Sequence, residues 1–157
     1  MTEKELVLSV LEQQGKENAS DLRARAPEMD GTGIIAEEEK IPWFDPEKNY
    51  TGWKTGSPVK QTVNGETQVF VLNIPHNAAE YPGVTPENNR TLWGISHTKD
   101  PAKAKPFVPP SGTSGLYKLD EVCTDPDAED PAVVYRNLKD DNEFPPHVMP
   151  SYWEVAE

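Results

Sequence analysis

The run Gln68-Val69-Phe70-Val71-Leu72 is a β-rich stretch of the chain, and a shorter run of the same kind, Val133-Val134-Tyr135, follows it in the sequence. Both runs are rich in β-branched and aromatic residues, which favour strands. Aligning Phe70 with Tyr135 gives an offset of 65 residues. We therefore expect two copies of one small β unit.

Landmarks on either side of these runs keep their order and residue type. The first copy contains Pro42, Trp43, Tyr50, Val59, Asn77, Tyr81-Pro82 and Trp93-Gly94-Ile95. The second contains Pro106, Phe107, Tyr117, Val122, Asn142, Phe144-Pro145 and Trp153-Glu154-Val155. Each copy predicts a short strand near Val59 or Val122, a stronger strand and a closing strand at the tryptophan. Asn64-Gly65 predicts a tight hairpin turn in the first copy.

This pattern predicts a mainly β protein, with two small antiparallel β modules in tandem preceded by an N-terminal helical arm. The expected divisions are residues 1–41 for the helix and an extended arm, 42–99 for the first module and 100–157 for the second. The proline-containing stretch Lys103-Ala104-Lys105-Pro106 is expected to be a stiff connector between the modules.

The N-terminal helix is expected to begin at a capping box formed by Thr2 and Glu5 and to end near Gly15. An apolar stripe marks one face of this helix and forms the predicted assembly site: Leu6, Val7, Val10 and Leu11. A helix of about a dozen residues is marginal alone, so the stripe must pack on the rest of the chain, on a partner or on a second copy.

Residues 18–41 are expected to form a polar arm, with a turn at Asp30-Gly31-Thr32-Gly33 and a short apolar pair, Ile34-Ile35. The acidic run Glu37-Glu38-Glu39 fits either a solvated face or a dock for a basic partner.

Charge and cysteine content exclude several classes of protein. The chain has 157 residues and a formal net charge of −12, which disfavours binding to nucleic acid or to an anionic membrane surface. The start of the chain lacks the pattern of a signal peptide, and no long apolar run predicts membrane insertion. The lone Cys123 excludes an internal disulfide. We expect a chain made in the cytoplasm that needs no cofactor.

The spaced aromatics resemble the small carbohydrate-binding modules of the chitin-binding type 3 group, over roughly residues 42–157. The pattern of that family is a tryptophan, a tyrosine, Gly-Asp-x-Val, an aromatic strand, asparagine, proline and a closing tryptophan. The chain departs from this pattern in two ways. In place of Gly-Asp-x-Val, the first copy has Gly56-Ser57-Pro58-Val59, with the glycine only, and the second has Leu119-Asp120-Glu121-Val122, with the aspartate only. The second copy also lacks the opening tryptophan.

Residues 21–42 resemble the leader of small proteins from phage and prophage structural gene clusters. That resemblance implies a virion component, in the tail, the baseplate or a fibre. The helix would then bind other virion proteins or a second copy of the chain, and a homo-oligomer is expected.

Aromatic rings bind sugars by stacking on the apolar face of a pyranose. Three rings are the candidate carbohydrate-binding residues: Trp53, Trp43 and Tyr152. Trp53 fits an exposed platform, or else a ring packed under the arm or at a subunit contact, and Trp43 fits a platform or the core. Trp93 and Trp153 are expected in the core, whereas Asn77 and Asn142 are expected to satisfy backbone groups in the following turn.

No motif predicts catalysis or a metal site. The acidic group Asp125, Asp127, Glu129 and Asp130 in the loop 124–130 offers oxygen ligands for calcium, but it fits a charged hairpin tip better. The three histidines are too scattered for a zinc motif, and no nucleophile motif is present. The expectation is a non-enzymatic virion protein whose modules contact host surface glycans; the alternative is a purely structural decoration or adaptor protein.

Overall fold

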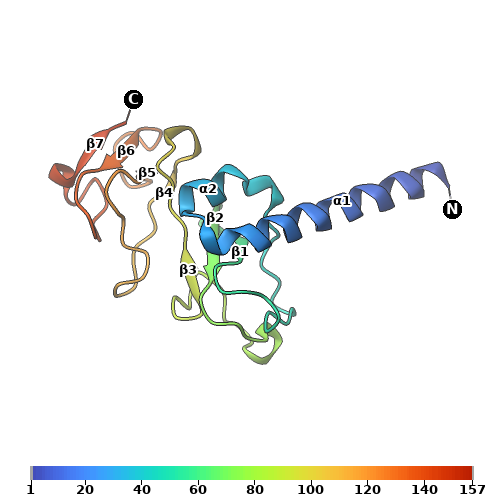
Figure 1. The fold of residues 1–157 in the computed structure, drawn as a ribbon. Coiled ribbons are helices and arrows are strands. Elements are labelled where there is room, and N and C mark those ends of the chain that lie inside the picture. The colour runs from blue at the N-terminus through green and yellow to red at the C-terminus, as the bar shows by residue number, and fades with distance from the viewer. Residues whose placement is uncertain (1, 157) are drawn as a thin grey trace.

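The computed structural model describes residues 2–156, and within them it shows a long N-terminal helix followed by two small β-sheets (Figure 1). The helices are α1 (Glu3–Arg25) and α2 (Gly31–Ala36). The first sheet has the order β1 (Pro58–Val63), β2 (Glu66–Leu72), β3 (Trp93–Ile95). The second has the order β4 (Lys105–Pro106), β5 (Val122–Thr124), β6 (Val134–Asn137), β7 (Trp153–Val155). The predicted fold class is confirmed; the terminal positions 1 and 157 of the predicted divisions lie outside the described residues.

Helix α1 begins at the predicted capping box, but its predicted end near Gly15 is wrong. Thr2 and Glu5 exchange the two hydrogen bonds of that motif. The helix then runs through Gly15 to Arg25. A glycine inside a helix costs only about 1 kcal/mol, which the good helix formers after it offset. No atom outside the helix lies within 4 Å of the position of a Gly15 Cβ, so an alanine would fit there without a clash.

Residues 18–41 do not form the expected extended polar arm, because they fold into helical segments with a small apolar core. The side chain of Asp30 accepts a hydrogen bond from the backbone of Gly33, so the expected turn is the N-cap of α2. The pair Ile34-Ile35 is buried. The cluster that joins the base of α1 to the first sheet consists of Leu22, Ala26, Ile34, Ile35, Ile41 and Val69.

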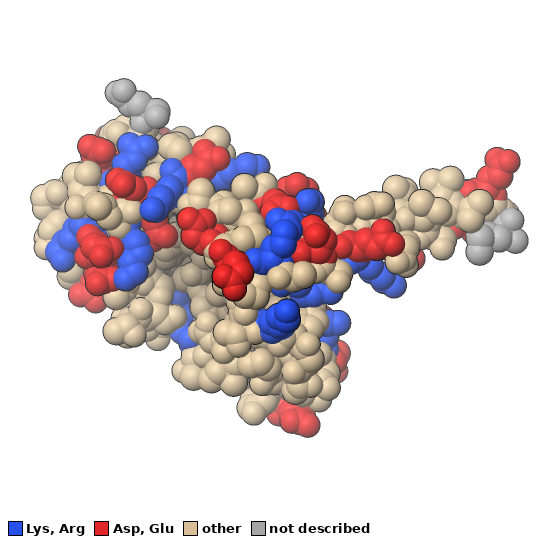
Figure 2. All heavy atoms as spheres, viewed as in Figure 1, with Lys and Arg blue, Asp and Glu red and all other residues tan. Residues whose placement is uncertain are grey.

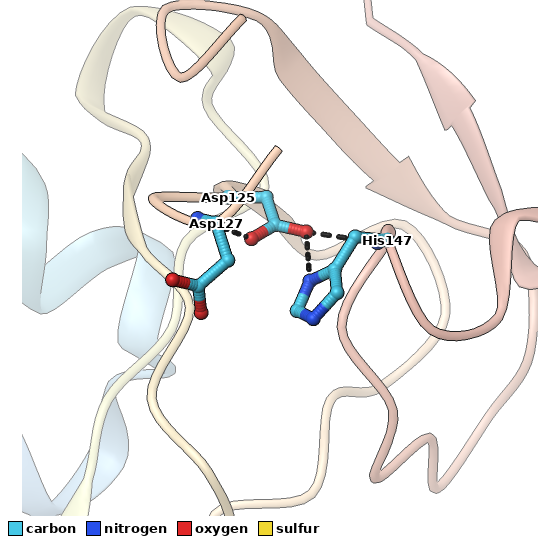
Figure 3. Close-up of side chains that lie close together, drawn as sticks. All are labelled: Asp125, Asp127 and His147. Carbon is cyan, nitrogen blue, oxygen red and sulfur yellow. Dashed lines mark hydrogen bonds and ion pairs between the residues drawn. The ribbon is translucent and has the colours of Figure 1, made fainter. Parts of the chain in front are cut away.

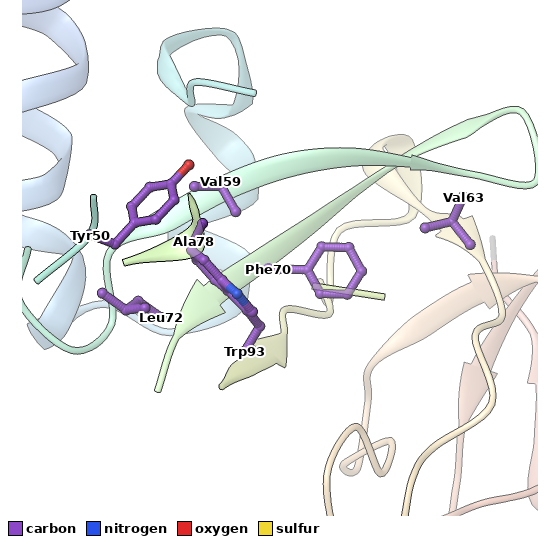
Figure 4. Packing of buried hydrophobic residues seen from close by; sticks show 7 residues of the cluster. All are labelled: Tyr50, Val59, Val63, Phe70, Leu72, Ala78 and Trp93. Carbon is purple, nitrogen blue, oxygen red and sulfur yellow. The ribbon is translucent and has the colours of Figure 1, made fainter. Parts of the chain in front are cut away.

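The two faces of β2 pack against different parts of the protein. Phe70 and Leu72 point into the core of the first module, whereas Val69 points to the base of α1. This follows from the two-residue period of a strand. Figure 4 shows the module core, which consists of Tyr50, Val59, Val63, Phe70, Leu72, Ala78 and Trp93. The predicted hairpin turn at Asn64-Gly65 is confirmed, with positive φ at both residues.

The second module repeats the strand pairing of the first. Leu72 pairs with Trp93 across β2 and β3, and Asn137 pairs with Trp153 across β6 and β7. Phe70 lies opposite Val59, and Tyr135 lies opposite Cys123. Val59 therefore corresponds to Cys123, so its expected match with Val122 is wrong by one residue.

The expected connector at Lys103–Pro106 contains strand β4, which pairs in parallel with β5 and makes the second sheet mixed. A parallel bridge between Trp43 and Lys60 occupies the matching place in the first module. Such short parallel pairings use backbone hydrogen bonds and need no alternation of apolar and polar side chains. The sequence therefore shows no strand pattern at these positions.

Helix α2 and the segment after β3 join the modules. The position of a Cβ on Gly31 would be 2.1 Å from the carbonyl oxygen of His97. The side-chain amide of Gln68 donates to the carbonyl of Pro106 (2.9 Å), and Lys105 Nζ donates to the carbonyl of Thr67 (3.0 Å). The ring of His97 stacks on Tyr117 at 3.7 Å between centroids. The first and second modules are thus in direct contact.

Candidate functional site

The outer part of α1 carries the most exposed group of large apolar side chains. We call this group the tip patch: Leu6, Val7, Leu8, Val10 and Leu11. Each member is at least 50% exposed. Figures 1 and 2 show α1 projecting away from the two modules. A cluster of large apolar side chains with this exposure is typical of an interaction surface.

The tip patch covers a wide arc of the helix. With 3.6 residues per turn, its members span about 200° around the axis, from Leu6 to Leu8. Residues 12–21 separate it from the docked base of the helix, and they are polar except for Gly15 and Ala19. Neither a single flat surface nor one neighbouring helix covers an arc of this width. The predicted stripe is thus exposed, and Leu8 is a member that the face pattern did not include.

Each module has a set of three aromatic rings with the same arrangement, two of them buried and one, Phe44 or Phe107, partly buried. Tyr50 meets Trp93 edge-on at 5.2 Å, and Phe44 stacks with Tyr50 at 6.0 Å. In the second module Tyr117 meets Trp153 at 5.5 Å, and Phe107 stacks with Tyr117 at 5.0 Å. Trp93 and Trp153 are core residues, as expected. Phe44 therefore corresponds to Phe107, and the expected match of Trp43 with Phe107 is wrong by one residue, since Trp43 is exposed.

The candidate Trp53 lies beneath α1, sandwiched by neighbouring side chains. Tyr50 meets the ring edge-on at 4.8 Å, the guanidinium of Arg23 lies 4.4 Å from its centroid, and Lys48 Nζ lies 5.5 Å away. Burial lowers the pKa of Arg23 from its ordinary value. Cation–π contacts favour these positions. The structure thus places Trp53 in the position of a clamp on the helix, the arrangement that the sequence offered as the alternative to an exposed platform.

Trp53 also belongs to a segment that the second module lacks. Ser57 donates a backbone hydrogen bond to Lys54, and Glu121 donates the matching one to Lys118. Lys118 follows Tyr117 directly, whereas Thr51-Gly52-Trp53 separates Lys54 from its tyrosine. The module that carries α1 therefore has an insertion that holds α1.

The other two candidate rings lie in separate places. Trp43 is 55% exposed, with Lys60 Nζ 4.8 Å from its centroid. Tyr152 is half-buried in the second module, with Lys139 Nζ at 5.3 Å and Phe144 at 6.4 Å. Among the described residues, no ring contact joins Trp43, Trp53 and Tyr152. The structure does not bring the three candidates together into one platform.

Asn77 and Asn142 act on backbone groups, as expected. The side-chain oxygen of Asn77 accepts from the backbone of Ala79, and that of Asn142 accepts from the backbone of Phe144. Asn142 also donates to Asn137, which is fully buried and donates to three carbonyls. These amides order the loops of the modules.

Asp125, Asp127 and His147 form a cluster with ligand atoms within 4.8 Å of one another (Figure 3). Asp125 is buried, and its carboxylate accepts from the backbone of Asp127 (3.0 Å) and from the backbone and Nδ1 of His147 (2.8 Å each). Desolvation raises the pKa of Asp125, but the hydrogen bonds from His147 and Asp127 outweigh it and keep the pKa below its ordinary value.

The oxygens of Asp125 are already in use, so two exposed groups remain to coordinate an ion: the carboxylate of Asp127 and the Nε2 atom of His147. Calcium takes six to eight oxygen ligands. Glu129 and Asp130, expected as part of a calcium loop, are exposed and not members of the cluster. The arrangement is a clamp that ties the loop after β5 to the loop before β7.

The acidic run Glu37-Glu38-Glu39 forms ion pairs within the chain. Arg25 and Lys40 both pair with Glu37, at 2.8 Å, and lower its pKa to about 2. Glu38 pairs with Lys105 of β4. Glu37 therefore ties the base of α1 to the segment after α2, and Glu38 ties that segment to the second module. Glu39 is exposed, as expected for a solvated face.

Two residues near the module junction have roles that the sequence reasoning missed. His97 is buried, lies 3.3 Å from a carboxylate oxygen of Glu121, and has an Nε2 atom with no partner in residues 2–156. Arg90 is the only lysine or arginine between Lys60 and Lys99. An isolated base in an acidic chain was the available signal for Arg90, whereas nothing local in sequence marks His97.

Comparisons with protein-family models, curated proteins and solved structures find no match to this chain. A search of the described helices finds none with the length and hydropathy needed to span a bilayer.

Proposed function

We propose that the protein is a non-enzymatic assembly component of a phage virion, an adaptor that self-associates through the tip patch of α1. The tip patch is the observation that carries this proposal: five large apolar side chains, each at least half exposed, at the end of a projecting helix. The placement in a virion rests on the likeness of residues 21–42 to the leaders of phage structural proteins.

A second copy of the helix is the occupant that fits the tip patch best. Symmetric copies of one helix cover a wide arc from two sides, as in bundles of three or more strands. Glu3, Lys4 and Glu5 precede the apolar residues and Glu12 follows them, so charges of both signs flank the tip patch. Burying five such side chains supplies about 1 kcal/mol or more for each one, which offsets the cost of ordering the helix.

The test is the molar mass in solution, measured by light scattering after size exclusion. We expect the intact chain to form oligomers and the variant Val7→Ser/Leu11→Ser to be a monomer with unchanged β structure. The matched control is Gln13→Ser/Gln14→Ser, which changes the polar part of the same helix and is expected to remain oligomeric. A monomeric intact chain at high micromolar concentration would contradict self-association.

Trp43 supports a second candidate function, contact with a glycan. It is the most exposed of the three candidate rings, at 55%, and a flat exposed indole suits stacking on a sugar. Binding of the intact chain and of Trp43→Ala to host cell wall tests this role. Equal binding by the two would remove Trp43 from any glycan site and would leave the adaptor role in place.

A further inference from the structure

A polar groove of about 600 Å³ lies where a loop of the first module meets a loop of the second. One wall is the segment before β3 and the other is a turn in the segment between β4 and β5. The lining consists of Asn88, Asn89, Arg90, Thr91, Ser111, Gly112, Thr113 and Ser114. The lining contains amides, hydroxyls and one guanidinium, with no carboxylate and no large apolar side chain. These groups suit a ligand with many oxygen atoms.

Arg90 is the one charged residue of this groove, and no carboxylate pairs with it in residues 2–156. Its guanidinium lies 5.8 Å from the centroid of Phe70, and its Nε donates to the carbonyl of Glu87 at 3.2 Å. The Nη1 atom is buried without a hydrogen-bond partner. Burial lowers the pKa of Arg90, and the nearby charge of Glu87 raises it without closing an ion pair. In a chain with 27 acidic and 15 basic residues, a groove-lining arginine without such a pair can still bind an anion.

Hydrogen bonds within the chain hold both walls in place. Asn88 accepts from the backbone of Thr85 (2.8 Å) and donates to the carbonyl of Gly83 (2.9 Å). On the other wall, Ser111 and Ser114 exchange two backbone hydrogen bonds around Gly112, whose φ is 59°. Gly115 must be small, because a Cβ there would lie 3.0 Å from Arg90 Nη1. A site organised in advance loses little entropy when a ligand binds.

We propose that this groove binds an oxyanion, a carboxylate or a phosphate, carried on a hydroxylated molecule such as an acidic sugar. The guanidinium of Arg90 would pair with the anion, and the amide and hydroxyl side chains of the two loops would bind the hydroxyls. The net negative charge of the chain opposes such a ligand only at short range, because salt screens charges beyond about 8 Å at physiological ionic strength. This inference is independent of the tip patch and of Trp43.

The test is a titration of the full chain, followed through its backbone amide resonances, with glucuronate, glucose 6-phosphate and glucose at constant ionic strength. We expect at least one anion to cause saturable shifts at the amides of residues 88–91 and 111–114, and glucose to cause none. Glucuronate and glucose 6-phosphate distinguish a carboxylate ligand from a phosphate ligand.

Thr113→Glu places a carboxylate on an exposed residue across the groove from Arg90, and we expect it to weaken binding about tenfold or more. The control Ser151→Glu makes the same charge change at an exposed position outside the groove and should bind within about twofold of the intact chain. The absence of saturable shifts with either anion, equal binding of glucose, or unchanged binding by Thr113→Glu would overturn the proposal. The molar mass of Thr113→Glu should match that of the intact chain, so failure here is separate from failure of self-association.

Discussion

Gly31 lies where α2 meets the segment after β3, and the two backbones are too close there for a residue with a side chain. A Cβ at Gly31 would sit 2.1 Å from the carbonyl oxygen of His97, which is backbone and cannot rotate away. We expect Gly31→Ala to lower the free energy of unfolding by about 1–3 kcal/mol, the range for overpacking. Urea denaturation followed by tryptophan fluorescence measures it. Gly15→Ala is the control, because that position is open and alanine should raise the helix content seen by circular dichroism.

Trp53 should stabilise the base of α1. Replacing it with alanine removes the ring between Tyr50 and Arg23, so we expect a loss of about 1–3 kcal/mol. Limited trypsin digestion should then cut sooner at Arg23 and Arg25. Trp43→Ala, at an exposed ring, should change neither the stability nor the digestion. If Trp53→Ala were as stable as the intact chain, the clamp would be wrong and Trp53 would return as a candidate platform.

The Asp125 clamp makes a pH-dependent contribution to stability. Hydrogen bonds from His147 and Asp127 hold the pKa of Asp125 below its ordinary value, so the folded state favours the carboxylate. The contribution is therefore complete above the unfolded pKa of about 4 and is lost as the pH falls through the folded pKa. At pH 7 we expect Asp125→Asn to lower the free energy of unfolding by about 1–3 kcal/mol, because the variant loses hydrogen bonds to a charged group.

Urea midpoints from pH 7 to pH 3 test this expectation. The gap between Asp125→Asn and the intact chain should narrow as the medium becomes more acidic. Asp127→Asn changes the exposed neighbour and should show a smaller gap at every pH. A gap for Asp125→Asn that stays constant down to pH 3 would show that the charge of Asp125 is not what stabilises the clamp.

Among the secondary-structure elements, the strands could be predicted from the sequence, but the end of α1 at Arg25 could not. Phe70, Tyr135, Trp93 and Trp153 carry period-two patterning and aromatic spacing, which are local signals. The continuation of α1 past Gly15 depends on Leu22 and Ala26 packing on the first sheet, which is a tertiary effect. Propensity is overridden by such packing.

The candidate site shows the same division between local and tertiary signals. The apolar stripe of α1 could be predicted from the sequence, because the spacing of its residues within one helix is a local signal. The position of Trp53 under Arg23 depends on where α1 lies, which no window around Trp53 reveals. The cluster of Asp125 and His147 joins loops 22 residues apart in sequence, and the groove at Arg90 needs both modules in contact.

In the whole molecule, the two small modules are joined through the helical segment formed by the base of α1 and α2. Phe70 lies in the core of the first module and Tyr135 packs against a separate core in the second, in matching strand registers. Each unit of about 50 residues buries little surface alone, so contacts through α2, His97 and Lys105 contribute to both. The projecting half of α1 gains nothing from these contacts, which supports the proposal that it associates with a second copy.

Self-association through α1 can be measured by hydrogen exchange of the amides in residues 6–20 at low and high protein concentration. An isolated helix of this length, with Gly15 in its middle, is marginal in water. We expect weak protection at low concentration and protection that rises at least tenfold as oligomers form, while the amides of β2 keep the same protection throughout. Protection of residues 6–20 that does not change with concentration would contradict the proposed association.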